Sequence, residues 1–152
     1  MSESALKQTL SDAMKDAMRS RDKARLGTIR LALAEIKKIE VDERIDPDDG
    51  RIIGVLDKMI KQRRESVSQY QAGGRQDLAD VEDAEIVILQ EFMPQPVSEQ
   101  ELEGIISKAI ADIGASSIQD MGKVMTAVRP ALLGRADMAA VSRMIKDRLA
   151  QG

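Results

Sequence analysis

Two residues of opposite charge, Arg63 and Glu85, stand inside rows of apolar residues at helical spacing. Arg63 lies ten residues before Gly73, and Glu85 lies eleven residues after Gly74. If two helices reverse direction at these glycines, the charges reach the same height and face each other. We predict a structural ion pair that sets the register of the hairpin, because buried charges are usually paired. A charged pocket, with Glu85 as a base or Arg63 holding an anion, is the alternative, and Arg30 is a candidate third member.

A second set of charged residues lies near the C-terminus. Residues 114–152 hold six basic and three acidic residues, whereas residues 1–94 hold 16 basic and 19 acidic ones. A local excess of positive charge is compatible with a phosphate-rich partner. Base stacking needs aromatic side chains, and Tyr70 and Phe92 are the only aromatic residues. Contact with RNA would therefore involve the backbone and shape of a folded RNA, and the candidates are Lys123, Arg129 and Arg135.

The composition excludes several kinds of chemistry. The chain contains no cysteine and no histidine, which rules out thiolate nucleophiles, zinc fingers and a Ser-His-Asp triad within it. The paired serines of "GASS" precede a predicted helix and are explained as its cap. The carboxylates of "DPDDG" lack the spacing of an EF-hand and are explained as a turn. We predict no catalytic residue, no metal site and no cofactor, which argues against an enzyme.

The elements that position these residues are all expected to be helices. Apolar residues repeat at helical spacing over residues 4–20, and Asp22 can cap a second helix. A third helix should end at Gly73 and Gly74, and a fourth should start at Asp77. The residues expected to face inward on the fourth helix are Leu78, Val81, Ile88 and Phe92.

The segment "PQPVS" resembles a linker, because two prolines in three residues disfavour both helix and strand. The "SEQE" that follows predicts a capping box, with Glu101 reaching back to the helix start at Ser98. Two further helices should follow, the last one capped by Asp137. With no strand pattern present, we predict an all-α fold. Residues 1–94 should form an antiparallel bundle of about four helices, and residues 95–152 a small three-helix domain.

Four longer stretches together resemble the YqeY-like family over nearly the whole chain: "TIRLALAEIK", "KMIKQRRES", "GRQDLADVEDAEIVILQEFMP" and "DMGKVMTAVRPALLGRAD". This family is similar to the tail region of the B subunit of the glutamyl/aspartyl-tRNA amidotransferase. That enzyme makes Gln-tRNA or Asn-tRNA from the mischarged precursor, and its tail is a helical appendage that contacts tRNA. The resemblance therefore implies two helical units and a link to tRNA. The positions that match the tail signature are Gly122, Lys123, Arg129, Gly134, Arg135 and Asp137.

The resemblance does not include the catalytic parts of the B subunit, and no Ser-Ser-Lys amidase arrangement can be assigned. We therefore favour a non-catalytic helical module associated with tRNA or a tRNA-charging complex, and expect no DNA partner. One alternative is a component with glutamine-dependent carbon–nitrogen ligase activity. The other is a protein-interaction adaptor that uses exposed apolar helix faces.

The expected location rests on two features of the chain. No stretch approaches the roughly 20 apolar residues that span a bilayer, so no membrane association is expected. The N-terminal "MSESALKQTL" has neither the basic region nor the apolar region of a secretory signal. We therefore expect a cytoplasmic protein. The oligomeric state stays open.

Overall fold

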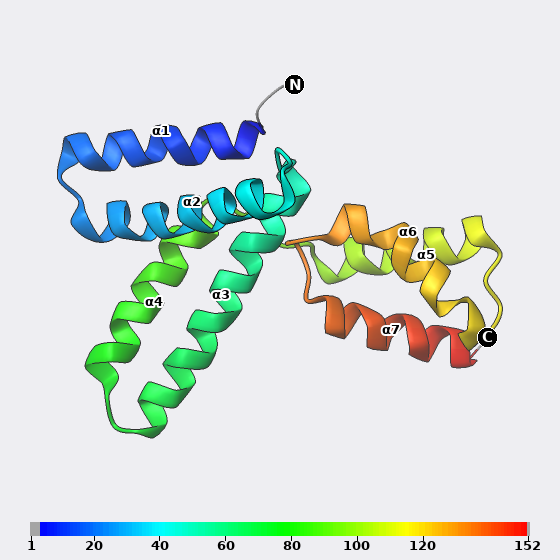
Figure 1. Cartoon of the computed structure of the whole chain (residues 1–152). Coiled ribbons are helices and arrows are strands. Elements are labelled where there is room, and N and C mark those ends of the chain that lie inside the picture. The colour runs from blue at the N-terminus through cyan, green and yellow to red at the C-terminus, as the bar shows by residue number, and fades with distance from the viewer. Residues whose placement is uncertain (1–3, 152) are drawn as a thin grey trace. The chain divides into compact units, whose positions relative to one another are not determined.

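The computed structural model describes residues 4–151, and every regular element in this range is a helix (Figure 1). The prediction of an all-α fold is confirmed. Contacts divide the chain into two compact units, Met1–Met93 and Pro94–Gly152.

Four helices build the larger unit, and short polar side chains determine where three of them begin. The Asp22 carboxylate accepts the N–H of Arg25 at 3.1 Å, and the Asp48 carboxylate accepts the N–H of Arg51 at 2.8 Å. The Ser4 hydroxyl caps the first helix in the same way. The four helices are α1 (Ala5–Ser20), α2 (Lys23–Glu43), α3 (Asp49–Ala72) and α4 (Gln76–Gln90).

The chain reverses between α3 and α4 at Gly73 and Gly74. Gly74 has a φ of 75°, a conformation that residues with a Cβ atom rarely adopt. The N–H of Arg75 donates to the carbonyl of Tyr70 at 2.8 Å and closes the turn. Because the turn is short, α3 and α4 run antiparallel and side by side (Figure 1).

The residues of α4 that face the core differ in part from those expected. The prediction for α4 is wrong at Val81, whose side chain is 56% exposed. Ala79 and Ile86 are buried instead, because α4 turns the adjacent side of its surface toward the core.

The core of the larger unit is almost entirely aliphatic. Its buried cluster consists of Leu10, Ile29, Ala32, Ile36, Ile52, Leu56, Met59, Ile60, Ile86, Leu89 and Phe92.

The smaller unit contains α5 (Glu99–Ile113), the short 3-10 helix η1 (Ile118–Asp120), α6 (Met121–Leu132) and α7 (Met138–Gln151). Pro130 lies in the last turn of α6, which ends two residues later. Gly134 has a φ of 75° in the connection to α7, where the N–H of Ala139 donates to the Asp137 carboxylate at 3.2 Å. The unit has its own buried cluster, formed by Ile106, Val124, Val128, Leu132, Val141, Ile145 and Leu149.

Candidate functional site

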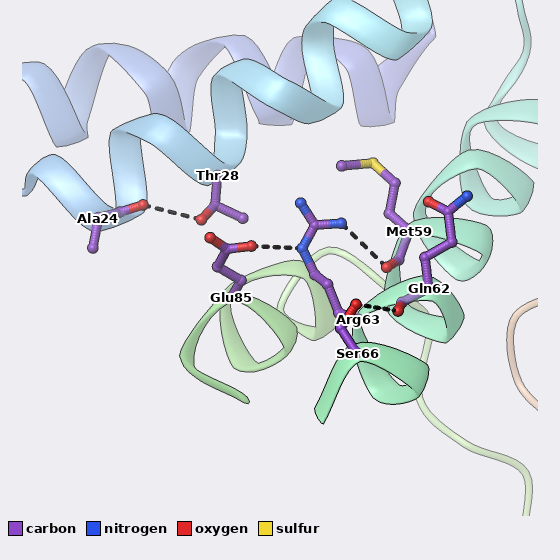
Figure 2. A network of polar contacts seen from close by, with 7 residues as sticks. All are labelled: Ala24, Thr28, Met59, Gln62, Arg63, Ser66 and Glu85. Atoms are coloured by element: carbon purple, nitrogen blue, oxygen red, sulfur yellow. Dashed lines mark hydrogen bonds and ion pairs between the residues drawn. The ribbon is translucent and has the colours of Figure 1, made fainter. Parts of the chain in front are cut away.

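Arg63 and Glu85 meet across the α3–α4 hairpin. Arg63 Nε donates to Glu85 Oε2 at 2.7 Å, and Arg63 Nη1 donates to the carbonyl of Met59 at 3.2 Å (Figure 2). The side chains are 13% and 27% exposed, so the pair is partly withdrawn from water. Both charges are therefore compensated inside the unit. This geometry is that of a structural link between two helices rather than of a free base or an empty anion site.

The third candidate, Arg30, stays outside this pair. Its side chain is exposed on α2, and within residues 4–151 it makes no ion pair. Thr28 of α2 is 2% exposed, and in Figure 2 its side chain points toward the pair. Its hydroxyl donates to the carbonyl of Ala24 at 3.0 Å. Thr28 therefore uses its hydroxyl within α2.

The exposed surface of α6 carries the other predicted site. Lys123 and Arg129 are both exposed, and neither makes an ion pair with any residue that the structure describes. Helical spacing places Gly122, Thr126 and Pro130 between these two cations. A Cβ atom added at Gly122 would meet nothing within 4 Å. The result is a small-residue surface with one positive charge on each side.

Arg135 has a different setting from the other two basic candidates. Its Nε donates to the carbonyl of Gln95 at 3.0 Å, and its Nη2 donates to the Glu101 carboxylate at 3.0 Å. Its Nη1 donates to the carbonyl of Ala131 at 3.4 Å, and its own carbonyl accepts the N–H of Val97 at 2.9 Å. Arg135 therefore ties the segment before α5 to the end of α6.

A shallow hollow of about 480 Å³ lies beside the N-terminal half of α6. Most of its lining is apolar, and Lys123 supplies its single charged group. Such a hollow can take an apolar group that carries a negative charge next to it. The residues that line it are Ile113, Gly122, Lys123, Thr126 and Ala127.

Asp120 positions the start of α6. Its carboxylate accepts the N–H groups of Ser116 at 3.0 Å and Ser117 at 3.3 Å. These hydrogen bonds hold the pKa of Asp120 below its usual value, and the positive charge of Lys123 acts in the same direction. The carboxylate is therefore part of a capping arrangement that orders the loop before α6.

Groups of three or more side chains able to ligate a metal do not occur among residues 4–151. Over the same range, each helix is too short or too polar to cross a bilayer.

The comparison with known families gives a match over most of the chain. The model of a family described as Yqey-like protein matches residues 7–149. The chain belongs to this family. The match includes the α3–α4 hairpin with Arg63 and Glu85, and it also includes the surface of α6.

Three curated relatives are longer fungal proteins. A protein of Kluyveromyces lactis is 34% identical over 95% of this chain and 80% of its own length. A protein of Pyrenophora tritici-repentis is 29% identical over 88% of this chain and 75% of its own length. One of Vanderwaltozyma polyspora is 33% identical over 68% of this chain and 58% of its own length. All three are named "Altered inheritance of mitochondria protein 41, mitochondrial".

The expectation of a cytoplasmic location is wrong by this comparison, because these relatives are named mitochondrial proteins. The stretch "MSESALKQTL" lacks the features of a secretory signal, but mitochondrial targeting depends on other features. The first three residues of that stretch also lie outside the described part of the chain.

The sequence did not predict the ion pair between Arg135 and Glu101. The capping box placed the Glu101 side chain at the start of α5, but it pairs with Arg135 instead, 34 residues away. Only the Ser98 half of the motif forms, where the Ser98 hydroxyl accepts the N–H of Glu101 at 3.1 Å. No local signal could have revealed this, because the contact depends on how α5 and α6 pack.

Proposed function

We propose that this protein is a non-catalytic module that binds a folded RNA such as tRNA through the exposed surface of α6. The observation that carries the proposal is that two exposed cations, Lys123 and Arg129, make no ion pair with any residue between 4 and 151 and stand on either side of Gly122, Thr126 and Pro130. Small residues between two cations allow a sugar–phosphate backbone to approach the helix closely, with a positive charge on each side.

The proposed contact is to phosphates and shape rather than to stacked bases. Both aromatic residues, Tyr70 and Phe92, belong to the larger unit, so the smaller unit has no ring on which a base could stack. The likeness of "DMGKVMTAVRPALLGRAD" to the tail of the amidotransferase B subunit supports tRNA as the particular RNA. It does not by itself support amidotransferase activity, because a shared appendage carries no catalytic group.

Within this proposal Arg135 has a supporting role. Its guanidinium already donates to Gln95, Ala131 and Glu101. The energy of an added phosphate contact would therefore be offset by the loss of these hydrogen bonds. Lys123 and Arg129 make the contact, and Arg135 holds the surrounding segment in place.

A protein-interaction adaptor is the second candidate, and the hollow beside α6 favours it. Ile113 and Ala127 leave apolar surface open there, next to the charge of Lys123. An acidic amphipathic helix would fit such a hollow. The experiment that separates these candidates therefore measures RNA binding directly.

The test is binding of unfractionated tRNA by the full chain across a salt series. We expect affinity to fall steeply with salt, and the variant Lys123→Gln/Arg129→Gln to lower the slope by about 2, or about 1 per lost phosphate contact. The matched control is Lys108→Gln/Lys146→Gln, which removes two exposed cations from α5 and α7.

Absence of tRNA binding at low salt would rule out the proposal, as would equal losses in the two variants. Glutamine-dependent transamidation by the isolated chain would support the ligase alternative instead. If Lys123→Gln/Arg129→Gln keeps its tRNA affinity but no longer binds a protein partner, the result favours the adaptor.

A further inference from the structure

The outer surface of α2 carries a row of cations in the acidic larger unit. The row consists of Lys23, Arg30, Lys37 and Arg44, which recur every seven residues and are all exposed. Seven residues make nearly two helical turns, so Lys23, Arg30 and Lys37 project from the same side of α2, about 10 Å apart along its axis and over about 21 Å in all. Arg44 follows directly after the helix as its C-cap, with a φ of 55°. We refer to these four residues as the α2 row.

Small residues separate the cations of the α2 row. Gly27 and Ala34 lie between them on the same side of the helix, both exposed, and a Cβ atom at Gly27 would meet nothing within 4 Å. Val41 completes this series and is 62% exposed. A long partner can therefore lie against α2 along its length, with the cations on its surface.

The charges of the α2 row are not neutralised within the structure. None of the four cations makes an ion pair with a residue between 4 and 151. Nearby cations differ, since Arg25 pairs with Glu91 and Arg63 with Glu85. Even Glu40, four residues before Arg44, pairs with Lys7 at 2.7 Å instead.

The exposed carboxylates of α2 do not interrupt the row. Glu35 and Asp42 lie more than a quarter of a turn around the helix from Lys23, Arg30 and Lys37, and Glu43 pairs with Arg51. Rows of Lys and Arg often serve to cover a hydrophobic flank with their stems. Here the side chains are exposed and small residues lie between them, so covering apolar surface does not explain the row.

We propose that the α2 row binds the sugar–phosphate backbone of double-helical RNA. A straight line of charges on a rigid helix complements a line of phosphates whose positions are also fixed, so little ordering entropy is lost on binding. An anionic membrane is a less suitable partner because it is flat, and Leu31 at 50% exposure is the largest apolar side chain that α2 could insert.

This inference goes beyond the proposed function by placing a second RNA surface in the larger unit. Both proposals name RNA as the ligand, but RNA binding by the α2 row does not require any contact with α6. The two surfaces can therefore be tested separately in the same full-length protein.

The test is binding of an RNA duplex of about 16 base pairs across a salt series. The variant Lys23→Gln/Arg30→Gln/Lys37→Gln should bind at least about tenfold more weakly, with the salt slope lowered by about 3. The matched control, Lys15→Gln/Lys58→Gln/Arg64→Gln, removes three exposed cations elsewhere in the unit that make no ion pair with a described residue. It should change affinity less than about threefold. Circular dichroism confirms that both variants fold.

Equal losses of duplex affinity in the two triple variants would overturn the inference about the α2 row. The proposed function would still stand if Lys123→Gln/Arg129→Gln lost tRNA binding. Loss of duplex binding only in the α2 variant would support the inference, even if Lys123→Gln/Arg129→Gln kept full tRNA affinity. Binding to vesicles of phosphatidylcholine and phosphatidylserine that depends on the α2 row, without duplex binding, would overturn it in favour of a membrane surface.

Discussion

Arg63 and Glu85, 22 residues apart in the sequence, form an ion pair in which Arg63 Nε lies 2.7 Å from Glu85 Oε2. The pair joins α3 to α4, and Thr28 of α2 points toward it (Figure 2). Because Arg63 also donates to the carbonyl of Met59, its position on α3 is held by two acceptors. The pair thus fixes the height of one helix against the other.

Glu85→Gln should destabilise the larger unit by about 2 kcal/mol. This value lies between the small cost of breaking an exposed pair and the larger cost of leaving a buried charge uncompensated. Urea denaturation followed by circular dichroism measures it. Glu65→Gln, an exposed residue of α3 without an ion pair in the described structure, is the control and should change stability by less than about 0.5 kcal/mol. Unchanged stability with loss of a bound ligand would instead indicate a charged pocket.

Arg135→Lys should destabilise the smaller unit by about 1–2 kcal/mol. Lysine keeps the charge but cannot reach Gln95, Ala131 and Glu101 at once. The measurement is again chemical denaturation. Arg143→Lys makes the same chemical change at an exposed position of α7 and should have no measurable effect. Equal stability of the two variants would contradict a structural role for Arg135.

Acidification should weaken the larger unit through Asp49. The hydroxyl of Ser4 and the N–H of Leu6 donate to this carboxylate and hold its pKa below the usual value of 3.8. A lowered pKa means that its contribution is complete above about pH 4 and is lost as the pH falls through the folded-state pKa.

Asp49→Asn should therefore reduce the dependence of unfolding free energy on pH below about pH 4. Denaturation midpoints measured between neutral pH and about pH 2 give this dependence. Asp46→Asn, an exposed change just before α3, serves as the control. If both variants keep the wild-type pH profile, the hydrogen bonds to Asp49 do not contribute to stability.

A fragment of residues 95–152 should be only marginally stable in isolation. The smaller unit has its own buried cluster, but a chain of fewer than about 60 residues buries a small share of its surface. Thermal unfolding followed by circular dichroism should show a broad transition at low temperature. A cooperative transition at high temperature would show that its core suffices.

Much of the helical architecture could be predicted from local patterns. The helix starts at Asp22 and Ser98 could be predicted from the sequence, because a cap accepts hydrogen bonds from N–H groups only two or three residues away. The meeting of Arg63 and Glu85 followed from counting residues on either side of a turn, because both helices rise by the same length per residue. Counting could not tell how deeply the pair is buried.

Prediction failed where the outcome depended on packing between helices. Val81 is exposed although its spacing matches the apolar residues around it, because the side of α4 that is buried depends on the position of α3. The contacts of Arg135 were missed for a related reason. Its acceptors lie on residues 4 to 40 positions away, and no local pattern connects them.

By itself, the sequence determined the helical period, the turn at Gly73 and Gly74, and the absence of thiol and imidazole chemistry. These properties depend on the backbone and side chains of a few neighbouring residues. Only the tertiary structure decided how far the Arg63–Glu85 pair is buried and which other charges are compensated, since Coulomb attraction and hydrogen bonding act through space. It joined Arg135 to Glu101, and within residues 4–151 it left Lys123, Arg129 and the α2 row exposed without ion pairs.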